Sequence, residues 1–509
     1  MADTVAGLLA AHPADAPAIG APDQPWMSFG ALRELAAHTG SVLHAMGAGP
    51  QTRVAIVLDN GPAMAAAFIT VACHATTAPL NPAYRQEELE FYMDDLKAGA
   101  LIVADGDDGP AVAAATKLNI PILRLAPTGD AAGQFTLTAP AQSGAPATGP
   151  APGPDDVALI LHTSGTTSRP KIVPLLQSNL VASARHIGQT LALSPQDCCL
   201  NIMPLFHIHG LIAAVLSSLA AGASIVCTPG FNALNFFKWF EAAKPTWYTA
   251  VPTMHQAILA RAARNQEIVA GSQLRFIRSS SASLPPQVMT ALEEALHAPV
   301  IESYGMTEAT HQMASNPLPP AEHKAGSVGI AAGPKVRIAS ETEDRLLAQG
   351  EIGEVVICGP NVTPGYESNP EANEKAFFLI DGERWFRTGD QGAHDEEGYL
   401  RLTGRLKEII NRGGEKVSPL EVDEVLMDHP AIQQVVTFAI PHDKLGEEVG
   451  AAVVLREGQQ ADEKAIRAFA AERLADFKVP RKVVVLTEIP KGATGKLQRI
   501  GLAEKLGLV

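Results

Sequence analysis

The chain contains, at residues 157–171, the stretch Val157-Ala158-Leu159-Ile160-Leu161-His162-Thr163-Ser164-Gly165-Thr166-Thr167-Ser168-Arg169-Pro170-Lys171. Its apolar start is typical of a buried strand. The loop that follows can hold phosphate, because hydroxyls and free backbone N–H groups donate to phosphate oxygens, glycine permits close approach and lysine adds charge. The alternative is a solvated turn, since Ser, Thr, Gly and Pro are common in turns. Five hydroxyl residues and two cations directly after an apolar run favour the phosphate loop.

This loop is not a Walker A motif, because no GK[ST] sequence closes it and Pro170 precedes Lys171. A second partial match to the Walker A motif includes residues 492–496. In it, Pro490 occupies the first glycine position of the motif and Leu497 occupies the Ser/Thr position. A P-loop nucleoside triphosphatase is therefore disfavoured at both places.

Helix-like and strand-like segments alternate around the loop. Helical spacing of apolar residues occurs at 29–46, 61–73, 86–96 and 178–191, with Ser178 as the expected N-cap; strand-like runs occur at 53–58, 100–103, 224–227, 247–251 and 274–278. The alternation predicts an α/β fold with two doubly wound sheets. Residues 139–154 are rich in Ala, Pro and Gly and are expected to form a surface connection.

The pattern changes after residue 326. Short apolar runs such as 353–358 lie among Gly, Pro and Asn residues, which predicts a barrel-like subdomain. A smaller α+β unit of about a hundred residues is expected after 404–408, with strands at 435–440 and 450–455 and a helix at 462–474.

Composition restricts the class of protein. The 509 residues carry a net charge of −15, with 46% hydrophobic and 18% charged residues, which is typical of a globular enzyme and argues against a nucleic-acid-binding surface. Five cysteines without a CxxC pair favour a reducing compartment. We see no secretory signal, no apolar run of membrane-spanning length and no peroxisomal Ser-Lys-Leu ending, so a cytoplasmic location without a membrane partner is expected.

Two histidines, His207 and His209, follow a short apolar run. Their spacing is compatible with metal binding, but no Cys or carboxylate cluster accompanies them. Without further evidence, each of the two histidines is interpreted as a structural residue whose ring is hydrogen-bonded inside the fold. His207 is the better functional candidate, because it follows a predicted strand end, where open α/β sheets bind ligands.

Four further polar residues suit nucleotide chemistry. Glu308 can hold Mg²⁺ against ATP phosphates, and Tyr304 can cover a purine face. Asp390 can accept from ribose hydroxyls, and Lys496, in a Gly-containing loop of the small unit, suits a cation brought to a phosphoryl centre. Each of these residues alone is weak evidence for a nucleotide site, since an isolated Glu or Lys is usually only solvated.

Taken together, these segments resemble the acyl-adenylate-forming superfamily of acyl-CoA synthetases over nearly the whole chain. The matching segments, in order, are 163–171, 204–210, 304–308, 388–390, 404–408, 413–416 and 495–496. Within the superfamily, residues 161–171, 247–253, 275–283 and 306–311 most resemble the oxalate–CoA ligases. Ser168 and Ile172 stand where the wider superfamily commonly has glycine, which we expect to stiffen the loop.

The resemblance implies an N-terminal AMP-binding domain, residues 1–404, and a mobile C-terminal domain, residues 405–509, that carries the catalytic lysine. It implies ATP-dependent ligation of a small acid to CoA through an acyl-adenylate, with AMP and pyrophosphate released, Mg²⁺ as cofactor and only small molecules as partners. The ATP-binding residues that it assigns are Thr163, Ser164, Gly165, Thr166, Thr167, Lys171, Ser281, Ala282, Glu302, Ser303, Tyr304, Thr307, Asp390 and Arg405.

The resemblance also assigns the remaining roles. Lys496 and His207 are catalytic, Glu308 and Thr166 hold the metal, Lys407 is the hinge, and Gly413 and Gly414 face CoA. The acid lies among His207, Ser280, Ser281 and His311.

These side chains favour a short dianion such as oxalate, because a second buried carboxylate must be paired or hydrogen-bonded. The alternative is that His311 only packs and that malonate or another small acid binds. A non-catalytic nucleotide or acyl-CoA sensor is expected to lack Lys496 or Glu308, and both are present. An enzyme that loads a carrier protein is a third alternative, but no carrier segment with its attachment serine is evident.

Overall fold

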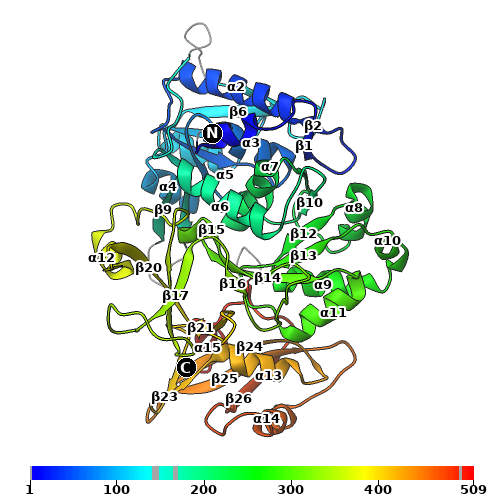
Figure 1. Ribbon diagram of the computed structural model, residues 1–509, viewed down its shortest axis with the longest axis vertical. Helices are drawn as coiled ribbons and strands as arrows, with labels where there is room; N and C mark the ends of the chain where they lie inside the picture. The colour runs from blue at the N-terminus through cyan, green and yellow to red at the C-terminus, as the bar shows by residue number, and fades with distance from the viewer. Residues whose placement is uncertain (1–2, 140–147, 164–169, 492–495) are drawn as a thin grey trace.

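The computed structural model describes residues 3–139, 148–163, 170–491 and 496–509. Four sheets and their helices form the molecule, with the last sheet in the smaller unit at the bottom of Figure 1. The predicted α/β class is confirmed, and the two large sheets lie in the upper part.

The first large sheet has seven strands and contains the strand that opens the sequence. Its central strands are parallel and its two edge strands are antiparallel. The spatial order is β7 (Phe135–Thr138), β6 (Ile122–Pro127), β5 (Ala100–Ala104), β3 (Arg53–Val57), β4 (Thr76–Pro79), β8 (Val157–Thr163) and β9 (Lys171–Leu176). Its helices are α2 (Phe29–Ala45), α3 (Pro62–Ala72), α4 (Gln86–Asp95), α5 (Pro110–Lys117) and α6 (Gln177–Thr190).

The second large sheet has nine strands, of which the central ones are parallel. The spatial order is β16 (Ile330–Ala331), β15 (His311–Ser315), β14 (Val300–Met306), β13 (Phe276–Ser279), β12 (Trp247–Ala250), β10 (Cys198–Asn201), β11 (Ser224–Cys227), β1 (Pro17–Gly20) and β2 (Met27–Ser28). Its helical segments are α1 (Val5–Ala10), the π-helix η1 (His209–Leu216), α7 (Ser217–Ala220), α8 (Phe236–Ala243), α9 (Pro252–Ala262), α10 (Gln266–Ala270), α11 (Pro286–Leu296) and the 3₁₀-helix η2 (Thr307–Ala309).

Helix α3 joins the two large sheets. It contacts β3 and β4 of the first sheet and β1 and β11 of the second. Every residue from Met64 to Ala72 is buried, because this Ala-rich helix is covered on all sides and therefore needs no polar face.

Two smaller sheets complete the fold. The region expected to be barrel-like contains β17 (Lys335–Ala339), β18 (Gly353–Cys358), β19 (Phe377–Ile380), β20 (Glu383–His394) and β21 (Leu400–Arg405), all antiparallel, with α12 (Pro370–Ala376). The C-terminal sheet contains β22 (Ile410–Arg412), β23 (Glu415–Val417), β24 (Ile432–His442), β25 (Gly446–Leu455) and β26 (Lys482–Leu486), with α13 (Pro419–Met427), α14 (Glu463–Ala471) and α15 (Leu502–Lys505).

The start of α6 differs from the prediction. The helix begins at Gln177, so Ser178 lies inside its first turn and is not the N-cap. The Asn179 side chain instead accepts from the Leu176 N–H at 2.9 Å, and the Ser178 N–H donates to the Pro154 carbonyl at 2.9 Å. A side chain at the third helical position therefore organises this helix start.

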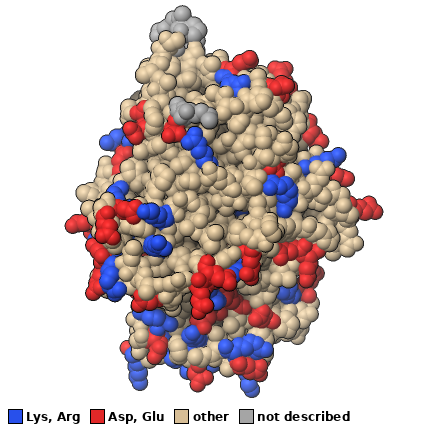
Figure 2. Space-filling view, viewed as in Figure 1, with Lys and Arg blue, Asp and Glu red and all other residues tan. Residues whose placement is uncertain are grey.

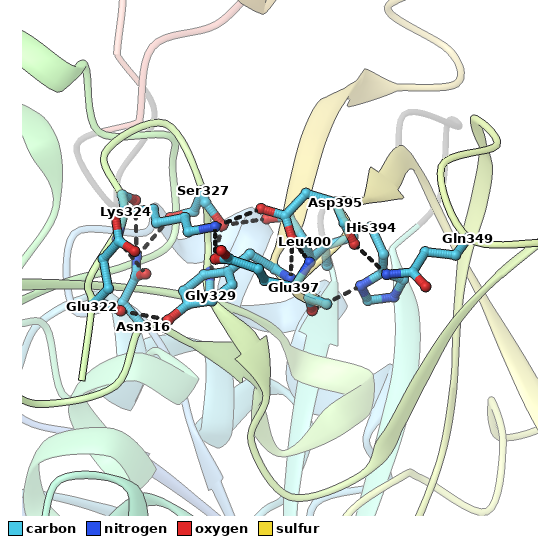
Figure 3. Close-up of polar contacts among 12 residues, drawn as sticks. Asn316, Glu322, Lys324, Ser327, Gly329, Gln349, His394, Asp395, Glu397 and Leu400 are labelled. Carbon is cyan, nitrogen blue, oxygen red and sulfur yellow. Dashed lines mark hydrogen bonds and ion pairs between the residues drawn. The ribbon is translucent and has the colours of Figure 1, made fainter.

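A polar network fixes the β20–β21 hairpin to the segment that follows β15 (Figure 3). Lys324 forms an ion pair with Asp395 at 2.9 Å and a second with Glu397. The Ser327 hydroxyl donates to the Leu400 carbonyl at 2.9 Å, and the Asn316 amide donates to the Ser327 carbonyl at 2.7 Å. This network sets the position of β20 and β21, which carry Asp390 and Arg405, relative to the nine-stranded sheet.

The surface carries charges of both signs. Figure 2 shows acidic and basic side chains interspersed over one face of the molecule. In the part of the chain that the structure describes, no helix is both long enough and apolar enough to cross a bilayer. All five cysteines are free thiols.

Gly305 is a position where two strands leave no room for a side chain. A Cβ there would lie 1.8 Å from the His311 carbonyl oxygen, so we expect Gly305→Ala to lower the free energy of unfolding by about 2 kcal/mol or more. Thermal and urea denaturation of the purified variant measure the change. Gly188→Ala is the matched control, because its Cβ meets open space and alanine favours the helix. Equal stability of the Gly305 variant and the wild type would contradict this packing.

Candidate active site

Several predicted site residues lie at or just after the carboxyl ends of strands in the two large sheets. Strand β8 ends at Thr163, β13 ends at Ser279, and β14 ends at Met306. Glu308 follows β14 in η2, and Ser280 and Ser281 follow β13. Ligands of open α/β sheets bind at such strand ends.

The hydroxyl-rich loop connects two antiparallel strands. Thr163, the last residue of β8, lies opposite Lys171, the first residue of β9. Ser164, Gly165, Thr166, Thr167, Ser168 and Arg169 lie outside the described residues, so their predicted contacts with phosphate and metal stay predictions. Ile172 is a buried strand residue opposite His162.

A buried carboxylate lies beside Lys171. Glu308 is 6% exposed and accepts a hydrogen bond of 2.9 Å from the Tyr366 hydroxyl. The Lys171 ammonium lies 4.2 Å from the centre of the Tyr366 ring. Burial raises the pKa of Glu308, and the nearby charges of Lys171 and Arg405 oppose that rise. The arrangement fits Mg²⁺, which usually binds to one or two carboxylates together with substrate phosphates.

Tyr366 was not predicted from the sequence. It lies in a Gly- and Pro-containing segment between β18 and α12, and one tyrosine in such a loop carries no functional signal. Its role follows from the fold, which places its hydroxyl on Glu308.

Tyr304, Asp390 and Arg405 form a second group. The Tyr304 hydroxyl donates to Asp390 Oδ2 at 2.5 Å, and Arg405 Nε lies 3.4 Å from Asp390 Oδ1. Asp390 and Arg405 are directly opposite in the β20–β21 ladder. Tyr304 thus contacts the predicted ribose-binding carboxylate, while its predicted place against the purine stays a prediction.

Lys496 of the C-terminal unit lies next to these groups. Burial, with a smaller contribution from the charge of Arg405, lowers the pKa of its ammonium to about 8, and Asp390 and Glu308 oppose the change. Three residues later, Arg499 binds Asp423 at 2.5 Å and lies 3.5 Å from Glu408. Glu408 and Lys407 belong to the link between β21 and β22, so ion pairs connect the lysine segment to this link.

The predicted acid site contains a chain of buried hydrogen bonds. His209 is the first residue of η1. Its Nε2 lies 2.6 Å from Thr249 Oγ1, and its Nδ1 lies 3.0 Å from Ser281 Oγ. The His209 and His311 ring centres are 5.0 Å apart. His209 therefore has the structural role that was its default, and it positions the Ser281 hydroxyl.

Both predicted acid-binding histidines are neutral at physiological pH. Burial lowers the pKa of His207 to about 3, and the charge of Lys496 adds to this effect. Burial likewise lowers the pKa of His311 well below its usual value, with further contributions from Arg278, His207 and Lys496. A neutral imidazole offers one N–H donor and one acceptor nitrogen.

Three residues at this site have left-handed backbone conformations. The φ angles are +75° at Ser281, +51° at Thr310 and +93° at His311. Such conformations cost about 1–3 kcal/mol each for residues other than glycine and are concentrated at functional sites. The strain observed here is further reason to treat Ser281 and His311 as site residues.

The remaining predicted residues support these groups. The Ser280 hydroxyl donates to the Ser303 carbonyl at 2.9 Å, and Glu302 Oε1 accepts from the Leu284 N–H at 2.8 Å. Burial raises the pKa of Glu302 to about 8. Ala282 is exposed after Ser281, and Thr307 starts η2.

Gly413 and Gly414 lie in the turn between β22 and β23. Their φ angles are +62° and +99°, which favour glycine. In the described part of the chain, the Gly413 N–H binds the Leu445 carbonyl and the Gly414 N–H binds Asn411, inside the C-terminal unit. Their predicted contact with CoA stays a prediction.

Arg278 of β13 was also missed as a site residue. Its guanidinium donates to Gln312 Oε1 at 3.1 Å and lies 3.5 Å from His311 Nδ1. The available signal was a cation that follows Phe276 and Ile277 on a predicted buried strand, because a charged residue on a buried strand requires a partner.

Comparisons with known proteins agree with this geometry. The AMP-binding enzyme family matches residues 8–367, and the AMP-binding enzyme C-terminal domain matches residues 421–496. The chain is 47% identical to an oxalate–CoA ligase of Arabidopsis thaliana, covering 89% of this chain and 88% of that protein. It is 41% identical to an oxalate–CoA ligase of Saccharomyces cerevisiae, covering 89% of this chain and 87% of that protein. The ATP-bound crystal structure of MatB from Rhodopseudomonas palustris superimposes with a TM-score of 0.87 at 28% identity, covering 99% of each chain.

The environment of Lys496 predicts a measurable titration. Its ammonium loses its proton as the pH rises through about 8, well below the usual value for lysine of about 10.4. Because Arg405 lowers this pKa, Arg405→Gln is expected to raise it. Carbon-13 NMR of reductively methylated protein measures both values, and Lys496→Arg identifies the resonance. Titration at the usual lysine value in the unsubstituted chain would show that Lys496 does not occupy this site.

Proposed function

The chain belongs to the AMP-binding enzyme family, and from this premise we propose that it ligates oxalate to CoA. It is an AMP-forming acid–CoA ligase that works through an acyl-adenylate and uses ATP and CoA. One observation carries the proposal: the Lys496 ammonium lies close enough to interact electrostatically with Asp390 and Glu308 on one side and with His207 and His311 of the predicted acid site on the other.

In the first half-reaction, a carboxylate oxygen of the acid attacks the α-phosphorus of ATP, and pyrophosphate leaves. Lys171 and the hydroxyl-rich loop hold the leaving phosphates, while Asp390 and Arg405 hold the ribose. Lys496 is protonated near neutral pH and lies between these groups and the acid pocket, where its charge stabilises the anionic transition state. Bound Mg²⁺ would neutralise phosphate charge from its place on Glu308.

The acid pocket favours oxalate for reasons of polarity and size. A dicarboxylate needs hydrogen-bond donors for its second carboxylate, since a buried carboxylate without partners is heavily penalised. Neutral His207 and His311 can each donate one N–H, and the Ser281 hydroxyl can donate a third hydrogen bond. The 47% identical plant relative and the 41% identical yeast relative, both named oxalate–CoA ligase, support the same acid.

In the second half-reaction, the CoA thiol attacks the acyl-adenylate and AMP leaves. Lys496 occupies the space beside the acid and the α-phosphate, so it must withdraw before the thiol enters. We place the domain boundary between residues 404 and 405 and the hinge at Lys407, in the link after β21. Rotation of residues 405–509 would remove Lys496 and bring Gly413 and Gly414, which have no side chains, to the pantetheine.

The acid preference is tested with a panel of substrates. Pyrophosphate release is measured with oxalate, malonate, acetate and benzoate, with and without CoA. We expect the highest kcat/KM with oxalate, and acyl-CoA only when CoA is present. Preference for malonate would replace oxalate within the same activity, and preference for acetate or benzoate would contradict a dianionic substrate.

The role of Lys496 is tested by separating the half-reactions. Lys496→Ala is expected to slow adenylate formation by about 10²–10³-fold, because it removes a cation from the transition state. Conversion of supplied oxalyl-adenylate to oxalyl-CoA is expected to stay near the wild-type rate. Lys491→Ala is the matched control, since Lys491 is an exposed residue of the same segment that pairs with Glu488. Equal loss of both half-reactions would refute the assignment.

A further inference from the structure

Arg278 is a fully buried cation in the middle of the nine-stranded sheet. It is 0% exposed and is among the largest fully buried side chains of the described residues. It lies in register beside Thr249, whose hydroxyl contacts His209. Arg278 therefore belongs to the polar layer beneath the acid pocket.

The hydrogen bonds of Arg278 leave much of its guanidinium without a partner. Nη2 donates to Gln312 Oε1 at 3.1 Å and lies 3.5 Å from His311 Nδ1. The Gln312 amide nitrogen donates to Thr190 and to the Ala332 carbonyl, which orients Oε1 toward the arginine. Among the described residues, Nε and Nη1 have no hydrogen-bond partner.

The charge of Arg278 is also not balanced by a carboxylate. Its guanidinium takes part in no ion pair within the described ranges, and the segments outside those ranges, 1–2, 140–147, 164–169 and 492–495, contain no Asp or Glu in the sequence. Burial lowers the pKa of Arg278 to about 9, so it remains charged at neutral pH. An uncompensated buried charge is costly, and such charges are normally paired.

We propose that Arg278 is a specificity-determining residue that makes the predicted acid site select dianions over monoanions. This inference rests on the proposed function, in which a small dicarboxylate binds beside His311. The second carboxylate of that substrate supplies the negative charge that the buried arginine lacks. Binding of the substrate would complete an ion pair that the folded chain leaves half formed.

Arg278 also acts through His311. Arginine only donates hydrogen bonds, so His311 Nδ1 must be the acceptor, and the single imidazole proton lies on Nε2. The His311 ring then presents an N–H donor from its other nitrogen. Arg278 thereby fixes the tautomer that can bind a carboxylate.

A purely structural role is the competing explanation. In that case Arg278 supports β15 through Gln312, and its loss lowers the activity toward every acid by the same factor. Charge selection differs, because it changes the ratio between a dianion and a monoanion of the same shape. Oxamate provides this comparison, since it replaces one carboxylate of oxalate with an amide.

The experiment measures kcat/KM for oxalate and oxamate in the full-length enzyme by pyrophosphate release. Arg278→Met keeps an unbranched apolar stem and removes the guanidinium with its charge, and we expect the oxalate-to-oxamate ratio to fall by about 100-fold. Arg278→Lys keeps the charge and is expected to retain the ratio within about tenfold. Gln312→Met is the matched control, because it removes the other hydrogen bond of Arg278 and leaves the charge.

The outcomes separate the inference from the proposed function. If the wild type strongly prefers oxalate and Arg278→Met keeps the same ratio, the inference is overturned and the proposed function stands. If the wild type prefers malonate, the same comparison is made with malonate and its monoamide. If the wild type does not prefer any dicarboxylate over its monoamide, the proposed function fails.

Thermal denaturation verifies folding, and Arg278→Met is expected to be at least as stable as wild type, since it removes an uncompensated buried charge.

Discussion

The hydrogen bond between the Tyr304 hydroxyl and Asp390 Oδ2 joins parts of the chain that are far apart in sequence. Tyr304 belongs to the nine-stranded sheet, Asp390 belongs to the antiparallel sheet, and Arg405 beside it ends β21, just before the link to the C-terminal unit. Lys496 of that unit lies close enough for the same charges to shift its pKa. Asp390 thus interacts with residues of the nine-stranded sheet, of the antiparallel sheet and of the C-terminal unit.

Burial controls the electrostatics of this site. It keeps His207 and His311 neutral, it brings the pKa of Lys496 to about 8, and it raises the pKa of Glu308. A site of this kind attracts substrate through directed N–H and O–H groups as well as through charge. A metal ion on Glu308 would also compete with a proton for the carboxylate, because burial favours the protonated form.

Sequence patterns predicted the layered fold well, because apolar periodicity reports directly which faces are buried. Strands β3, β11 and β18 and helices α3 and α14 lie where their apolar runs indicated. The N-cap at Ser178 was wrong because Asn179, one residue later, competes for the same helix start. Motif order predicted Lys496, Glu308 and Asp390 as site residues. Tyr366 reaches Glu308 through a contact between distant segments, which no local pattern encodes. Arg278 had one local signal, a cation on a buried strand, but its partner Gln312 lies in another strand.

The left-handed backbone at His311 has a consequence for engineering. Its imidazole is aimed by a turn in which Gly305 lies against the His311 carbonyl with no space for a Cβ. Grafting the proposed acid preference onto a related scaffold by exchanging single side chains should fail, because the recipient backbone would point the ring elsewhere. The transferable unit is the whole β14–β15 turn with Gly305, Thr310 and the arginine beneath it.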